Sequence, residues 1–141
     1  MATEPYARRT IDDELDELLP LAPAIALEGP KGVGKTRTAL RRADVAWFLD
    51  DESHRALLAA DPTFATAPRG TLLVDEWQRL PAVWDSVRRR VDEGVPPGRF
   101  LLSGSAAPPG AAVLHSGAGR ILSLRMRPMA LHERPGAAPI V

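Results

Sequence analysis

The chain has 141 residues, enough for one domain with a hydrophobic core, and its 18 basic side chains balance 18 acidic ones. This balance gives no overall field that would attract nucleic acid or anionic lipid. The chain has no cysteine, which excludes disulfides and thiolate metal sites. No apolar run approaches the length of a membrane span. We therefore expect a cytoplasmic protein with no membrane partner and no clear nucleic-acid surface.

The first expected element is a short amphipathic helix within residues 1–20. Ile11, Leu15 and Leu18 recur at helical spacing, and Thr10 and Asp13 have the spacing of a capping box. We interpret the acidic residues between the apolar positions as a solvated face. The main domain is expected to follow, over residues 21–133.

Strand-length and helix-length segments alternate through that domain. The expected strands are Ala24–Glu28, Val45–Asp50, Thr71–Asp75, Phe100–Ser103 and Arg120–Leu124. The expected helices are Lys35–Ala43, Glu52–Ala60 and Pro81–Glu93. This alternation, with near-continuous apolar strands, predicts an α/β fold with a mainly parallel, five-stranded sheet between helical layers. Residues 104–119 are expected to form a long loop, and residues 134–141 a disordered tail.

The first chemical motif lies between the first strand and the next helix. Its pattern, G-x-x-x-x-G-K-T, is that of a phosphate-binding P-loop, which needs this strand–loop–helix context. Glycine allows backbone N–H groups to turn toward an anion, and the helix points its positive end at the same place. Predicted nucleotide-binding residues are therefore Gly29, Pro30, Lys31, Gly32, Val33, Gly34, Lys35 and Thr36. In this interpretation Lys35 reaches the β- and γ-phosphates, and the Thr36 hydroxyl is a ligand of Mg²⁺.

The second motif is a pair of carboxylates after the apolar strand Leu72–Val74. Asp75 and Glu76 fit the Walker B pattern of phosphate-transferring enzymes. Asp75 would hold Mg²⁺, usually through a water, and Glu76 would orient and deprotonate the attacking water. Many strands end in acidic residues, and it is the position some forty residues after a P-loop that favours the functional interpretation.

Two further residues are candidates for catalysis. Ser103, with Ser105 as an alternative, ends the next strand, where ATPases of this type carry a polar residue that senses the γ-phosphate or its attacking water. An ordinary Ser-Gly turn is the competing interpretation. Arg120 opens the last strand, where AAA-type ATPases often have an arginine that reaches a neighbouring subunit's nucleotide. It could equally be a solvent-facing arginine.

The three histidines lack the spacing of metal ligands and are interpreted as surface residues.

The spacing between the motifs separates the classes of P-loop protein. An additional strand fits between Lys35 and Asp75, and the Asp-Glu pair resembles the ATPase branch. The chain contains no asparagine, so the Asn-Lys-x-Asp motif of GTPases is absent. A small-molecule kinase is a weaker alternative, because such kinases usually lack the Asp-Glu pair.

Taken together, the motifs resemble those of uncharacterised bacterial and archaeal AAA-type ATP-binding proteins, which carry an amino-terminal ATPase domain and a separate carboxy-terminal domain. The resemblance spans residues 6–133 and rests on the segments Tyr6–Arg9, Gly29–Thr36, Phe48–Asp51, Val74–Pro81, Phe100–Ser105, Gly119–Arg120 and Arg127–Glu133. It includes the Asp-Glu-x-Gln box that ends at Gln78. Thr is usual at the position of Ser103.

This resemblance implies binding of ATP and Mg²⁺ and slow ATP hydrolysis. Family members continue well beyond Glu133, so we expect a truncated member that lacks the lid and the effector domain. A partner chain could supply them, and the oligomeric state stays open. The alternative is a non-catalytic nucleotide-binding module that depends on such a partner.

Overall fold

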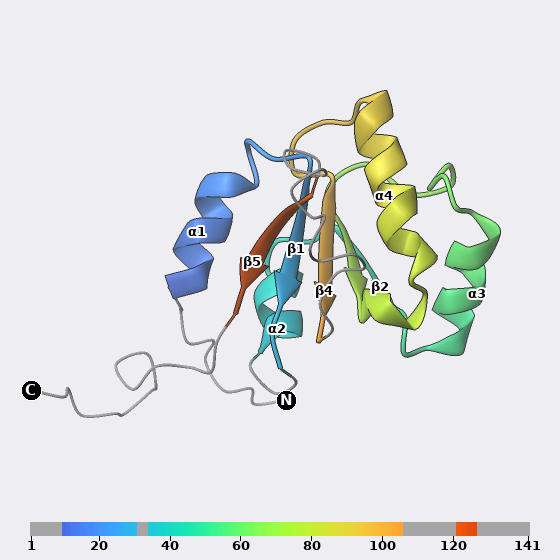
Figure 1. Cartoon of the computed structure of the whole chain (residues 1–141), viewed down its shortest axis with the longest axis horizontal. Coiled ribbons are helices and arrows are strands. Elements are labelled where there is room, and N and C mark those ends of the chain that lie inside the picture. The colour runs from blue at the N-terminus through green and yellow to red at the C-terminus, as the bar shows by residue number, and fades with distance from the viewer. Residues whose placement is uncertain (1–9, 31–33, 106–120, 127–141) are drawn as a thin grey trace, which may run out of the picture.

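The computed structural model describes residues 10–30, 34–105 and 121–126, in which helices surround a single sheet (Figure 1). The strands are β1 (Ala24–Glu28), β2 (Val45–Phe48), β3 (Leu72–Asp75), β4 (Phe100–Gly104) and β5 (Leu122–Arg125). The helices are α1 (Thr10–Leu18), α2 (Lys35–Leu40), α3 (Glu52–Ala60) and α4 (Ala82–Glu93), and residues Trp77–Arg79 form the 3₁₀ turn η1. The predicted α/β fold with a five-stranded sheet is confirmed.

The strand order is β2-β3-β4-β1-β5, and every neighbouring pair is parallel. The connections after β1, β2 and β3 therefore carry a helix back across the sheet, as parallel pairing requires. The strand that follows β3 in sequence, β4, lies between β3 and β1. This order brings the carboxyl ends of β1, β3 and β4 side by side.

Two hydrophobic clusters fill the space on the two faces of the sheet. Alternate residues of each strand point to opposite faces, so Ile25 and Leu73 join one cluster while Ala26 and Val74 join the other. The first face also takes residues of α1 and α2, and the second takes residues of α3, η1 and α4. Figure 1 shows the same division, with α1 and α2 on one side and α3 and α4 on the other. The molecule is a three-layer sandwich.

Helix α1 is held to the sheet by apolar contacts. Ile11 is 7% exposed and Leu15 is fully buried. Burying each such side chain contributes about 1.5–3 kcal/mol. The predicted amphipathic helix is confirmed.

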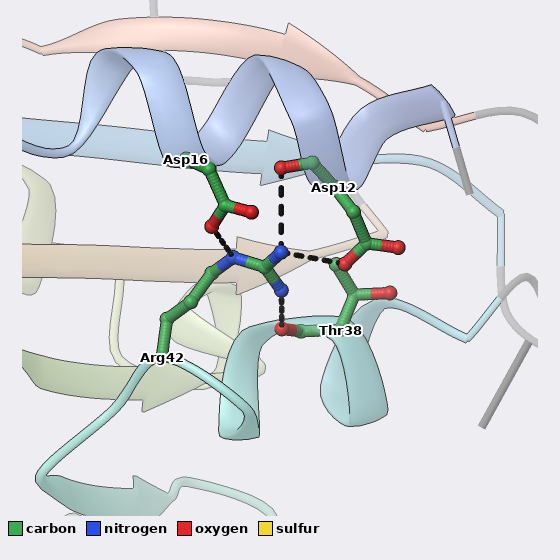
Figure 2. A network of polar contacts seen from close by, with 4 residues as sticks. All are labelled: Asp12, Asp16, Thr38 and Arg42. Atoms are coloured by element: carbon green, nitrogen blue, oxygen red, sulfur yellow. Dashed lines mark hydrogen bonds and ion pairs between the residues drawn. The ribbon is translucent and has the colours of Figure 1, made fainter. Parts of the chain in front are cut away.

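The acidic face of α1 is not wholly solvated, which corrects the interpretation made from the sequence. The Asp12 side chain is completely buried, and its Oδ1 lies 2.7 Å from the guanidinium of Arg42, just beyond α2. Arg42 also contacts Asp16 at 3.0 Å and donates to the Thr38 carbonyl at 2.9 Å (Figure 2). Periodicity could not reveal this pair, because a carboxylate beside the apolar stripe looks the same whether water or arginine faces it.

Most predicted bounds hold within two residues, and the differences have local causes. Helix α2 ends at Leu40 rather than Ala43, because residues 41–44 turn into β2 and the Arg42 amide bonds the Ala39 carbonyl instead of continuing the helix. Strand β5 begins at Leu122 rather than Arg120. The predicted tail 134–141 and most of the predicted loop 104–119 lie outside the described residues. The domain bounds 1–20 and 21–133 stay predictions. In the part of the chain that is described, no helix has both the length and the hydrophobicity needed to cross a bilayer.

Candidate functional site

The candidate site lies where three parallel strands end. Strand β1 runs into the motif that begins at Gly29, β3 ends at Asp75, and β4 ends at Gly104. The strand register places Ser103 of β4 beside Asp75 on one side and beside Leu27 of β1 on the other. Crevices at the carboxyl ends of parallel strands are the usual ligand sites of such sheets. Residues far apart in the sequence therefore meet at one edge.

Asp75 is the centre of the polar contacts at this edge. It is 6% exposed, and its Oδ1 accepts a hydrogen bond of 3.0 Å from the Thr36 hydroxyl and one of 2.5 Å from the Ser103 hydroxyl. Thr36 belongs to the first turn of α2, and Ser103 to β4. A buried carboxylate needs such donors, because burial removes its hydration. The two residues predicted as metal ligands, Thr36 and Asp75, are thus in direct contact.

This pair suits a magnesium ion. Adjacent oxygen ligands of octahedral Mg²⁺ lie about 3.0 Å apart, since each Mg–O distance is about 2.1 Å. The 3.0 Å separation of Thr36 Oγ1 and Asp75 Oδ1 matches that spacing. Among the described residues, no group of three or more His, Cys, Asp or Glu side chains could hold a metal alone. A magnesium ion here would take its remaining ligands from phosphate and water, which is how Mg²⁺ is commonly held in phosphate-transferring enzymes.

Lys35 is the first residue of α2, and its side chain turns back over the start of the motif. It is 6% exposed, and its ammonium donates to the carbonyls of Gly29 at 2.8 Å and Pro30 at 3.0 Å. Gly34, just before the helix, has φ of 91°, a conformation that glycine adopts without steric cost. The lysine charge is therefore held against the first two residues of the motif. Of the predicted binding residues, Lys31, Gly32 and Val33 lie outside the described residues.

Glu76 directly follows β3 and has a strained backbone. Its φ of 55° and ψ of 48° lie in the left-handed region, which is uncommon for a residue with a side chain. Its carboxylate is half-buried and accepts a hydrogen bond from the side-chain amide of Gln78. Strain of this kind concentrates at functional sites.

Ser103 contacts Asp75, and its predicted role as a sensor of the γ-phosphate stays a prediction. Its side chain is fully buried, and its hydroxyl donates to Asp75. Ser105, the alternative, is exposed, and its hydroxyl accepts from the Gln78 amide at 3.2 Å. Arg120 lies outside the described residues, so its predicted role is neither supported nor opposed.

Sequence reasoning left the role of Gln78 open and missed that of His54. Gln78 links Glu76 to Ser105, and its place in the Asp-Glu-x-Gln box was the one available signal. His54 is half-buried rather than a free surface residue. Its Nδ1 accepts a hydrogen bond of 2.9 Å from the backbone amide of Phe48, the last residue of β2, so that this amide has a partner. No spacing rule identifies such a contact in advance.

Comparison with known proteins places this site in a family. A family model described as an AAA domain matches residues 22–134, which include the five strands of the described sheet and the whole candidate site. The chain is also 36% identical, over 105 residues, to an uncharacterized protein of Mycobacterium tuberculosis and equally to one of Mycobacterium bovis. These matches cover 72% of this chain but only 24% of each relative. The chain belongs to the AAA domain family, whose members are nucleotide-binding proteins of the ATPase class.

Proposed function

We propose that this chain binds Mg²⁺–ATP and hydrolyses it slowly to ADP and phosphate. The observation that carries the proposal is the contact between Thr36 of the P-loop motif and Asp75 of the Asp-Glu pair. Thr36 and Asp75, which are 39 residues apart in sequence, bring two oxygen atoms into hydrogen-bonding contact, and the acid that could activate water follows Asp75 directly. A chance Gly-rich turn would have no reason to meet a carboxylate pair in this way.

Nucleotide binding is assigned to residues 29–36. The loop would surround the phosphates with backbone N–H groups, as P-loops do. Lys35 would exchange the carbonyls of Gly29 and Pro30 for the β- and γ-phosphates, whose negative charge makes them stronger acceptors. Thr36 and Asp75 would hold Mg²⁺, which neutralises charge that develops on the phosphates.

Hydrolysis is assigned to Glu76. Its carboxylate would accept a proton from the water that attacks the γ-phosphorus, while the bond to the bridging oxygen of ADP breaks. Ser103 is proposed to act through Asp75, whose Oδ1 it contacts, and the role as a direct sensor of phosphate remains a hypothesis. Arg120 is proposed to reach the nucleotide of a neighbouring copy, if copies associate.

A non-catalytic nucleotide-binding module is the second candidate. The contact of Ser103 favours it, because a hydroxyl that donates to Asp75 does not point its proton at a γ-phosphate. In this case a partner protein would supply what turnover requires.

One substitution separates the two candidates. Glu76→Gln keeps the size of the side chain but cannot take a proton, so it should bind a fluorescent ATP analogue as wild type does. Its phosphate release in single-turnover assays should fall by about 10²–10⁴-fold. Glu93→Gln makes the same chemical change at an exposed position on α4 and should release phosphate at the wild-type rate. Equal, negligible release by wild type and Glu76→Gln, with binding intact, would favour the non-catalytic module.

A further inference from the structure

Gln78 connects the Asp-Glu pair to the end of β4. It lies in η1, two residues after Glu76, and is half-buried. Its side-chain nitrogen donates to the Glu76 carboxylate and, at 3.2 Å, to the Ser105 hydroxyl. One amide group therefore joins the turn after β3 to the chain after β4.

The other end of this amide is its carbonyl oxygen, Oε1. Gln78 Oε1 is buried and has no hydrogen-bond partner among the described residues. It lies against Gly104, where a Cβ atom would stand 2.5 Å away from it. A buried acceptor without a partner is unfavourable, and folded proteins rarely keep one without a reason.

The orientation of the amide follows from the charge of Glu76. Rotating the amide by half a turn would place its carbonyl oxygen against the Glu76 carboxylate, and two acceptors repel. The observed orientation leaves Oε1 unsatisfied but gives the carboxylate a charge-assisted hydrogen bond, which is stronger than a neutral one. The amide is therefore oriented to hold the Glu76 carboxylate, and the carbonyl oxygen of Gln78 loses its own hydrogen bond as a result.

Glu76 adds a second unfavourable feature at the same place. Its left-handed backbone is strained, and the carboxylate that this backbone projects is the one that Gln78 holds. Two unfavourable features thus meet at the Glu76 carboxylate: a strained backbone and a carbonyl oxygen of Gln78 without a hydrogen bond. Such features are expected where residues are selected for function rather than for stability.

We propose that Gln78 is a positioning residue for Glu76, a role that rests on the hydrolysis proposed above. Its amide holds Glu76 Oε2, so that the other carboxylate oxygen is kept in place to accept the proton of the attacking water. Gln78 exchanges no proton itself. Through Ser105 it also ties the orientation of Glu76 to the end of β4.

The test substitution is Gln78→Met, which is nearly the same size but cannot donate a hydrogen bond. It also removes the buried acceptor. The kcat for ATP should fall about tenfold to a hundredfold, as expected when a reacting group loses its alignment. KM and the affinity for a fluorescent ATP analogue should stay unchanged. The melting temperature should stay the same or rise, because no buried carbonyl is left unsatisfied.

Arg79→Met is the matched control. Arg79 belongs to the same turn but is exposed, so kcat should stay at the wild-type value. A positioning role also predicts that Gln78→Met has no further effect on turnover once Glu76 is replaced by Gln, because residues that act as a unit are not additive.

The outcomes distinguish the failure of this inference from the failure of the proposed function. If wild type turns over faster than Glu76→Gln but no faster than Gln78→Met, hydrolysis stands and the positioning role is wrong. A clear loss of melting temperature in Gln78→Met, with parallel loss of affinity, would show a structural role and overturn the inference as well. If wild type and Glu76→Gln do not differ, the hydrolysis and the role of Gln78 in it both fall.

Discussion

At Gly104 the neighbouring side chains leave no room for a Cβ atom. A Cβ atom there would stand 2.5 Å from Gln78 Oε1 and 2.8 Å from the indole nitrogen of Trp77. The Gln78 side chain could shift, but Trp77 is 3% exposed and packs on Trp84 with 5.1 Å between ring centroids. The glycine is therefore needed for space rather than for an unusual backbone conformation.

We predict that Gly104→Ala destabilises the fold by about 1–3 kcal/mol, the usual cost of overpacking a well-packed site. Urea unfolding followed by tryptophan fluorescence measures the change, and the native emission should shift because Trp77 must move. Ser105→Ala is the control, because Ser105 is exposed and the substitution adds no atom. Equal stability of Gly104→Ala and wild type would mean that Trp77 and Gln78 yield without cost.

The residues of the candidate site were predictable where a spacing rule exists. The P-loop pattern identified Lys35 and Thr36, and the strand ending identified Asp75. Their meeting could be expected as well, because parallel strands end at one edge of the sheet. The partners of Ser103 and Gln78 could not be predicted, since they depend on side-chain rotations and on the register of β3 and β4.

Arg42 joins helix α1 to helix α2. Its side chain is 9% exposed and faces the fully buried Asp12, while Asp16 is half-exposed. Burial lowers the pKa of Arg42, but the hydrogen bond with Asp16 and the negative charges of Asp12 and Asp16 outweigh it, so the pKa is raised overall. The guanidinium therefore carries its positive charge at neutral pH. It also holds the Thr38 carbonyl, which anchors the last turn of the helix that carries Lys35 and Thr36.

We predict that Arg42→Met lowers the free energy of unfolding by about 3 kcal/mol, because it leaves Asp12 buried without its guanidinium. Asp16→Asn removes the negative charge of the more exposed partner of Arg42 and should cost about 1 kcal/mol or less. Urea denaturation at neutral pH measures both. Similar losses in the two variants would show that the buried pair contributes no more than a surface one.

The bounds of an element could be predicted where a long stretch of residues shows a clear period. They could not be predicted where the element is short. The stripe of α4 predicted Pro81–Glu93, and the structure has Ala82–Glu93. The 3₁₀ turn at residues 77–79 spans three residues and shows no period, so no pattern could indicate it. Strand β5 pairs with β1 alone in the described sheet, and an edge strand has fewer neighbours to fix its ends.

At the scale of the whole molecule, the site joins parts that the sequence keeps apart. Thr36 lies in the first turn of a helix on one face of the sheet, Asp75 is the last residue of β3, and Ser103 is the last residue but one of β4. The contacts at Asp75 hold these three elements together. A ligand that bound here would contact all three at once and would not bind the unfolded chain, in which they are separate. Binding should therefore stabilise the fold as a unit, and a change in global unfolding becomes a measure of occupancy.

We predict that Mg²⁺–ADP or Mg²⁺–ATP raises the melting temperature of the wild type. At a hundred times Kd the added stability is about 2.7 kcal/mol, which for a domain of this size is a shift on the order of 10 °C. Chelating Mg²⁺ should remove most of the shift, because the paired oxygens of Thr36 and Asp75 would then face the phosphates without a cation.

Lys35→Met should lose the shift in melting temperature as well. Its unliganded form should already melt lower, since Lys35 bonds two carbonyls of the loop, so the increment caused by ligand is the quantity to compare. Arg89→Ala, at an exposed position on the opposite face, should respond to nucleotide as wild type does. A folded wild type that shows no shift at millimolar nucleotide would contradict nucleotide binding at this edge of the sheet, and with it the assignment of residues 29–36.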